Sequence, residues 1–173
     1  MAKYATSETE KSRESLLPYC VGMGVDLGYG GDPITPTAIA VDLPEPYTKF
    51  DDFPQHLKGD ARNLYWFRDG VLDYVYSSSL LEDFPPAETV QIVREWLRVL
   101  KPGGHLVLLL PDEPFFRAHC ARTGQGYNDA HQNHDLTLEW FQAHIVPQLG
   151  VPVVHAKSPS GVYNFEVVLR KPE

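Results

Sequence analysis

Short apolar runs recur along the chain, separated by polar segments that are rich in glycine and proline. Four of these runs, at residues 24–27, 38–43, 72–77 and 105–110, are too short for helices and predict buried strands. The run at 105–110 is almost wholly apolar, which is typical of a central parallel strand covered on both faces. A weaker run at 56–58 predicts one more short strand.

Three other segments carry helical signals. The residues Ser7-Glu8-Thr9-Glu10 have the order of a capping box and predict a helix to about Leu17, which Pro18 ends. Residues 86–100 and 138–149 each present apolar side chains at helical spacing. These apolar stripes consist of Val90, Val93, Leu97 and Leu100 in the first segment, and of Leu138, Phe141, Ile145 and Leu149 in the second.

The last two predicted strands, 151–156 and 162–169, are joined by the short segment 157–161. Because so short a connection cannot carry a parallel crossover, these strands must form an antiparallel hairpin. The sequence therefore predicts an α/β fold: a single Rossmann-like, doubly wound sheet that is mostly parallel and ends in an antiparallel hairpin strand. No linker or repeat divides the chain, so we expect one domain over 1–173, with an amino-terminal helical segment at 1–17.

The segment most informative about function joins the first two strands. The first strand leads into a turn that contains Gly28, Gly30 and Gly31, and the second strand closes on Asp42. Glycines let the backbone come close to a ligand, and an acid at the carboxyl end of a strand can accept hydrogen bonds from ribose hydroxyls. This order is typical of a nucleotide-type cofactor site.

The connection at residues 28–37 is short for a crossover between parallel strands. It contains three glycines and two prolines, Pro33 and Pro36, which oppose helix formation. A strand-helix-strand crossover generally needs about a dozen residues or more, so we expect no helix longer than one turn there. The carboxylate of a cofactor would then be held by loop amides without a full helix dipole behind them.

Several motifs, taken in order, resemble those of the class I S-adenosylmethionine-dependent methyltransferases with a methyltransferase type 11-like domain. The resemblance extends from about residue 12 to residue 172 and includes the terminal hairpin. It implies a Rossmann-like fold, S-adenosylmethionine as the cofactor, and methyl transfer to an unidentified acceptor. The segments that match are 25–30, Asp42, 59–61, 77–84 and 97–104.

The resemblance also implies roles for individual residues. In that family the glycine turn lies against the methionyl part of the cofactor, the acid after strand two holds the ribose, and the acid after strand three meets the adenine. This chain departs from the family pattern at Asp32, where the third glycine usually falls, and at Pro33. The cofactor-binding residues implied are Asp26, Gly28, Tyr29, Gly30, Asp42, Leu43, Asp60, Ala61 and Ser77.

Residues 111–135 predict a loop that borders the acceptor pocket, because they leave a strand at the same sheet edge as the glycine turn. Within it, Tyr127, His131 and His134 are candidate catalytic residues that could orient or deprotonate a substrate. A solvated surface loop is the alternative. The two histidines have a spacing found in some zinc sites, but no further ligand follows at a known spacing, so we expect no metal.

Composition narrows the class of protein. The net charge of −8 argues against broad nucleic-acid binding, which needs a basic surface. No apolar run approaches the roughly 18 residues of a membrane span, and the polar start does not have the pattern of a secretory signal. Cys20 and Cys120 lie far apart, which favours reduced thiols and a cytoplasmic protein.

Two other functions stay open at this point. A catalytically inactive methyltransferase-like protein, acting as a binding or regulatory partner, is favoured by the shortened first turn. A dinucleotide-dependent oxidoreductase is disfavoured by the terminal hairpin and by Pro33. Because little chain precedes the first strand, we expect an open pocket, or one that a second copy or a partner protein covers.

Overall fold

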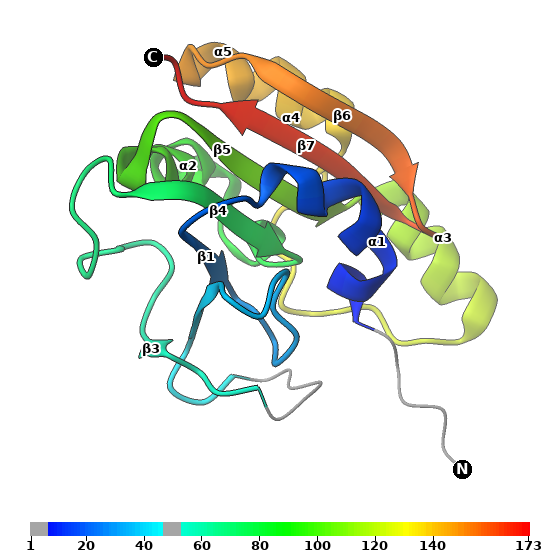
Figure 1. Ribbon diagram of the computed structural model, residues 1–173. Helices are drawn as coiled ribbons and strands as arrows, with labels where there is room; N and C mark the ends of the chain where they lie inside the picture. Colours follow the sequence, from blue (N-terminus) through cyan, green and yellow to red (C-terminus); the bar gives the residue numbers. More distant parts are fainter. Residues whose placement is uncertain (1–6, 47–52) are drawn as a thin grey trace.

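The computed structural model describes residues 7–46 and 53–173 (Figure 1). Its strands form one seven-stranded sheet in the order β3-β2-β1-β4-β5-β7-β6. The strand β7 runs antiparallel to both of its neighbours, and the other pairs are parallel, which confirms the predicted α/β fold with a terminal hairpin. The strands are β1 (Gly24–Leu27), β2 (Ile39–Asp42), β3 (Leu57–Lys58), β4 (Leu72–Ser78), β5 (Leu100–Pro111), β6 (Val153–Ser160) and β7 (Asn164–Arg170).

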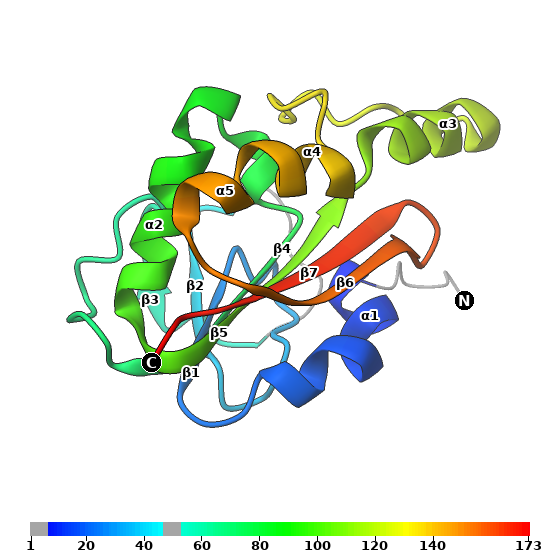
Figure 2. The ribbon, with the colours of Figure 1, turned by 90° about the horizontal axis from the view of Figure 1, so that it is seen from above.

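Helices cover the two faces of the sheet unequally. Figure 2 shows α2, α4 and α5 on one face and α1 on the other, while α3 extends past the end of β5. The larger apolar core lies under α2 and α4, where Trp96 and Phe141 are fully buried. The α-helices are α1 (Glu8–Leu16), α2 (Thr89–Val99), α3 (Glu113–Thr123), α4 (Leu138–His144) and α5 (Val146–Leu149), and short 3-10 turns are η1 (Leu17–Tyr19), η2 (Leu81–Asp83) and η3 (Pro86–Glu88).

The sparsely covered face depends on the connection between β1 and β2. No helix forms between residues 28 and 37, as the glycines and prolines predict. Ile34 and Ala38 of this connection instead pack with Leu16 of α1 against Tyr74 and Tyr76 of the sheet. Loop side chains and the amino-terminal helix thus bury the sheet face that a crossover helix would otherwise cover.

The predicted loop at 111–135 is wrong over its first half, because it contains the helix α3. The Asp112 side chain accepts a hydrogen bond from the Phe115 amide, Pro114 lies in the first turn, and Gly124 ends the helix in a left-handed conformation. Apolar periodicity does not reveal this helix, since only Phe116 and Cys120 are buried apolar residues in it. The capping residues at both ends were the signal in the sequence that predicts this helix.

Two further boundaries differ from the prediction. The helix predicted at 138–149 is divided at Ile145 into α4 and α5, and Pro147 lies in the first turn of the second piece. The predicted hairpin connection at 157–161 belongs largely to β6, which continues to Ser160 and pairs across to Asn164. In both cases the elements themselves are where the apolar pattern puts them.

The amino-terminal helix is joined to the terminal hairpin by a buried carboxylate. Glu166 on β7 is 0% exposed and accepts hydrogen bonds from Ser15 of α1 (2.6 Å) and from Ser160 of β6 (2.5 Å). His155 Nε2 lies 2.7 Å from the other carboxylate oxygen. Burial opposes ionisation, but these hydrogen bonds lower the pKa of Glu166 below its usual value of 4.5.

We expect Glu166→Gln to destabilise the protein by about 1.5–3 kcal/mol at pH 7, because charge-assisted hydrogen bonds to a buried group are lost. A lowered folded-state pKa stabilises the native state above the unfolded value of 4.5, and this contribution is lost as the pH falls through the folded-state pKa. Urea unfolding at pH 7 and at pH 3.5 measures the difference between variant and parent. That difference should shrink in acid, and an equal difference at both pH values would contradict the prediction. Glu139→Gln, at an exposed position on α4, is the control.

Within residues 7–46 and 53–173, no helix is long and apolar enough to cross a membrane. Cys20 and Cys120 are both buried as free thiols.

Candidate functional site

The glycine turn lies at the carboxyl end of β1, between β2 and β4. Gly28, Gly30 and Gly31 all have positive φ angles of 66°, 58° and 94°, a region that residues with a Cβ rarely adopt. A Cβ at Gly28 would also come within 3.1 Å of the side chain of Leu80, a residue in the segment that follows β4. The turn therefore needs glycine both for its backbone conformation and for its close approach to the neighbouring segment.

This turn opens into a cavity of about 560 Å³ at the carboxyl edge of the sheet. Its walls come from the glycine turn, the end of β2, the segment after β4, α3, the loop that follows α3, and the β6–β7 turn. The first turns of α1 form a further wall, through Ser7, Glu8, Thr9 and Lys11. The amino-terminal part of the chain thus supplies part of the cavity wall.

Asp42 presents a carboxylate to the cavity beside the glycine turn. Its Oδ2 accepts a hydrogen bond from the Gly30 amide (3.2 Å) and its Oδ1 accepts one from the Leu43 amide (2.8 Å). Burial raises the pKa of Asp42, and these two amides oppose that shift. A carboxylate has about four lone-pair sites, so acceptor capacity remains for hydroxyl groups of a ligand.

Asp26 has a structural position inside the first strand. It is 1% exposed, and its Oδ2 accepts a hydrogen bond from the Ile34 amide at 2.7 Å. Its Oδ1 has no hydrogen-bond partner among the described residues, and burial raises the pKa of this carboxyl well above its usual range. Through the Ile34 amide, Asp26 holds the connection between β1 and β2 against the sheet. Gly28, Tyr29 and Gly30, in contrast, line the cavity.

Asp32 connects the same segment to α1. Arg13 donates hydrogen bonds to the Asp32 carboxylate (2.7 Å) and to the carbonyls of Pro33 (2.6 Å) and Ile34 (2.8 Å). Ser7, the N-cap of α1, also donates to Asp32. The aspartate that replaces the family's third glycine therefore holds the amino-terminal helix against the glycine turn.

The other residues that the resemblance implies lie outside the cavity lining within the described chain. Leu43 is exposed just past Asp42. The Asp60 carboxylate is bonded to Arg62 (2.6 Å), and the Ala61 carbonyl accepts a hydrogen bond from the Trp96 indole (2.8 Å). Ser77 is buried and donates to the Leu27 carbonyl, while its neighbours Ser78 and Ser79 line the cavity.

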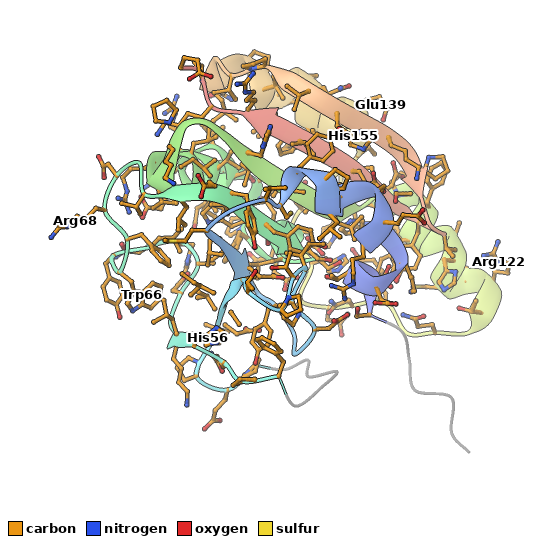
Figure 3. All side chains as sticks on the ribbon, viewed as in Figure 1. His56, Trp66, Arg68, Arg122, Glu139 and His155 are labelled. Atoms are coloured by element: carbon orange, nitrogen blue, oxygen red, sulfur yellow. The ribbon has the colours of Figure 1, made fainter. Side chains whose placement is uncertain are left out.

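Figure 3 shows where the aromatic side chains near Asp60 lie. Trp66 and His56 lie at the β3 edge of the sheet, and His155 of β6 lies at the opposite edge. The Trp66 ring covers Gly59, where an added Cβ would come within 2.4 Å of it. This side chain therefore fixes the turn after β3 in which Asp60 and Ala61 lie.

A polar wall forms the end of the cavity opposite Asp42. His131 is 6% exposed, and its Nδ1 lies 2.5 Å from Oε1 of Glu113, the first residue of α3. Tyr127 donates to the other Glu113 oxygen (2.7 Å), and its hydroxyl lies 3.1 Å from His134 Nδ1. Burial opposes the charge of Glu113, but hydrogen bonds from His131 and Tyr127 lower the pKa of this carboxyl. Of the three predicted catalytic residues, His131 lines the cavity, and Tyr127 and His134 lie behind it.

Glu82 faces His131 from the other side of this wall. It lies in η2, directly after β4, and is fully buried. Burial raises the pKa of Glu82 well above its usual range, and the nearby charges of Asp83 and Glu113 add to the shift. The structure therefore brings together three groups from separate parts of the sequence: Glu82, Glu113 and His131.

The middle of the chain is similar in sequence to a known protein family. The sequence profile of a family described as a methyltransferase domain matches residues 26–108. This match covers β1 to β5, together with the glycine turn and Asp42, and the remaining chain adds the antiparallel hairpin of the same fold. This part of the chain therefore matches a methyltransferase domain, in agreement with the predicted resemblance to the class I S-adenosylmethionine-dependent methyltransferases. Among curated proteins, no relative matches it.

Solved structures share the fold of this chain. A protein from Pyrococcus horikoshii superposes with a TM-score of 0.70 at 20% identity, over 100% of this chain and 96% of that one. A SAM-dependent methyltransferase from Archaeoglobus fulgidus gives 0.70 at 17% identity, over 98% and 96%. A chain from the complex of the Haloferax volcanii Trm112 methyltransferase activator with a methyltransferase gives 0.62 at 18% identity, over 94% and 89%.

Two acids of the polar wall, Glu82 and Glu113, were not predicted from the sequence. Glu82 was within a family motif but had no assigned role. Glu113 follows the end of the fifth strand, where ligands bind in open α/β sheets, and this position was the signal available in the sequence.

Proposed function

We propose that this methyltransferase binds S-adenosylmethionine in the cavity at the carboxyl edge of the sheet and transfers its methyl group to a small-molecule acceptor. The observation that best supports this function is the continuity of one cavity from Gly28, Gly30 and Asp42 to His131. Cofactor and acceptor can therefore meet inside one enclosed space. The acceptor itself is left open.

The cofactor end of the proposal rests on Asp42 and the glycine turn. The Asp42 carboxylate is held in place by the Gly30 and Leu43 amides, so it is oriented before a ligand arrives. A ribose with two adjacent hydroxyls can donate to such a group. The methionyl carboxylate would be bound by loop amides of residues 28–31, without the dipole of a crossover helix.

The acceptor end rests on the segment from α3 to the β6–β7 turn. Phe116 and Tyr163 contribute aromatic surface to the cavity, and their rings lie 5.0 Å apart. His119, Gln125 and Asn128 add polar groups around them. A few polar groups on an aromatic wall are typical of sites for small organic molecules.

Methyl transfer needs no protein nucleophile, because the sulfonium is already a strong electrophile. The acceptor atom attacks the methyl carbon, the carbon–sulfur bond breaks, and S-adenosylhomocysteine leaves. The protein contributes proximity and alignment, and it removes a proton where the acceptor carries one. We propose that His131 orients the acceptor at the end of the cavity near α3. Tyr127 and His134 hold the groups around His131 in place.

Isothermal titration calorimetry with S-adenosylmethionine, S-adenosylhomocysteine and nicotinamide adenine dinucleotide tests the proposed function. We expect both sulfur compounds to bind at one site per chain and the dinucleotide not to bind. At a ligand concentration of about 100 times Kd, S-adenosylhomocysteine should stabilise the folded state by about 2.7 kcal/mol.

The same titration separates the alternatives. Binding of the dinucleotide alone would support an oxidoreductase. Absence of binding by all three compounds, in a protein with a cooperative unfolding transition, would support an inactive methyltransferase-like protein.

A further inference from the structure

The end of the cavity near α3 contains a buried carboxylate that has no hydrogen-bond partner among the described residues. Glu82 is 0% exposed and lines the cavity. Both of its side-chain oxygens are buried without a hydrogen-bond partner among the described residues, and only the residue's own backbone amide offsets its burial. Because an unpaired buried carboxylate costs several kcal/mol, this group needs either a proton or a cation.

A histidine nitrogen faces this carboxylate at a distance that suits a shared cation. His131 Nε2 lies 3.8 Å from Glu82 Oε1, which is too long for a hydrogen bond. Metal–nitrogen and metal–oxygen bonds are about 2.0–2.2 Å long, so two ligands of one ion lie about 3.0–4.4 Å apart, depending on the angle between them. Asp83 supplies a third donor, and one ligand atom from each of the three residues lies within 4.8 Å of the others.

The orientation of His131 leaves Nε2 available as a ligand. Its Nδ1 lies 2.5 Å from Glu113 Oε1, so the carboxylate holds the proton on that nitrogen and the lone pair stays on Nε2. Histidines that bind metals commonly donate their other ring N–H to a carboxylate in this way. Glu113 is itself held by the Tyr127 hydroxyl at 2.7 Å and lies 3.6 Å from Arg117.

Backbone hydrogen bonds hold the two donor segments together. The amides of Gln132 and Asn133 both donate to the Glu82 carbonyl, at 2.8 and 3.1 Å. The Gln132 side chain donates to the Asp83 carbonyl at 2.7 Å. The carboxylates and the histidine are therefore arranged before any ion binds, which reduces the entropy lost on binding.

We propose that Glu82, Asp83 and His131 bind a divalent transition-metal cation at the cavity wall, with Glu113 as the positioning residue for His131. One imidazole and two carboxylates form a mixed donor set that suits Mn²⁺ or Zn²⁺, whereas Mg²⁺ and Ca²⁺ prefer oxygen ligands alone. Three protein ligands leave coordination positions open toward the cavity. This donor set differs from the His131–His134 spacing in the sequence, because His134 Nδ1 faces Tyr127 instead.

The role of the cation rests on the proposed methyl transfer, but its binding does not. Facing the acceptor end of the cavity, a divalent cation would lower the pKa of an acceptor hydroxyl, whose proton then passes to solvent. The hydroxyl oxygen attacks the methyl carbon of the sulfonium, and the products are a methyl ether and S-adenosylhomocysteine.

Binding of Mn²⁺ alone to chelator-stripped protein tests the site. Electron paramagnetic resonance measures the free ion, and competition with a chromophoric chelator measures Zn²⁺ in parallel. We expect one site per chain, with affinity reduced at least about tenfold in Glu82→Gln and in His131→Ala. Glu113→Gln should weaken binding by about tenfold to a hundredfold, as loss of an orienting carboxylate does elsewhere. His144→Ala, at an exposed histidine of α4 outside the cavity lining, is the matched control and should bind the ion like the parent.

The result is independent of the cofactor. Failure of both ions to bind the parent chain, or equal binding by Glu82→Gln and His131→Ala, would overturn the metal site. Urea unfolding checks that each variant is folded, and S-adenosylhomocysteine is titrated separately into the same samples. Normal S-adenosylhomocysteine binding without metal binding would leave the proposed function intact, and metal binding without S-adenosylhomocysteine binding would reject the proposed function alone.

Discussion

Asp42→Ala is expected to weaken S-adenosylhomocysteine binding about tenfold to a hundredfold, which corresponds to about 1.5–3 kcal/mol. The substitution removes the acceptor that we propose for the ribose hydroxyls, and it also leaves the Gly30 and Leu43 amides without their carboxylate. The glycine turn would then lose one of its fixed points beside the ligand. Calorimetric titration of the variant and the parent measures the effect.

Two further variants make this result specific. Asp42→Asn keeps the size of the side chain but removes its charge, so its affinity should lie between those of the parent and Asp42→Ala. Asp69→Ala removes an exposed acid that pairs with Arg98 away from the cavity, and its affinity should equal that of the parent. Unchanged binding by a folded Asp42→Ala protein would remove Asp42 from the proposed cofactor site.

Trp96→Ala is expected to cost about 3–5 kcal/mol of the free energy of unfolding. Trp96 is fully buried between α2 and the sheet, and its indole N–H donates to the Ala61 carbonyl at 2.8 Å. Truncation leaves a cavity and an unpaired carbonyl, two costs that add. Because small domains have only about 5–15 kcal/mol of stability in total, the loss should be visible as a large shift in the urea midpoint.

Tyr65→Ala provides the aromatic control for this experiment. Tyr65 is 69% exposed beside Trp66, so its removal should change stability by no more than about 1 kcal/mol. A similar loss in Tyr65→Ala and Trp96→Ala would show that the core under α2 is not what stabilises the fold.

In place of a crossover helix, side chains position the glycine turn between β1 and β2. The turn is fixed by Asp26 from inside the sheet and by Asp32 and Arg13 from α1. Side-chain hydrogen bonds thus hold the glycine turn in place, a role that a crossover helix has in the usual fold. The amino-terminal helix becomes part of the binding cavity instead of a remote extension.

Local sequence properties were enough to predict the sheet and the nature of its connections. Apart from Asp26 and His105, strands such as 24–27 and 105–110 consist of glycine and apolar residues, because these strands are buried on both faces. The absence of a helix at 28–37 follows equally from glycine and proline, which limit the backbone whatever surrounds it. The short connection before 162–169 likewise forces a hairpin.

The polar wall of the cavity was decided by tertiary structure alone. Glu82, Glu113 and His131 come from three elements, and His131 reaches Glu113 across 18 positions of the sequence. Such contacts depend on how η2, α3 and the following loop fold back over the sheet edge, which no local pattern records. The helix α3 was missed because few of its residues are apolar and buried, so its capping residues, and not its periodicity, define it. Local sequence sets backbone preference and burial, whereas the distances between charged groups in a site exist only after the chain has packed.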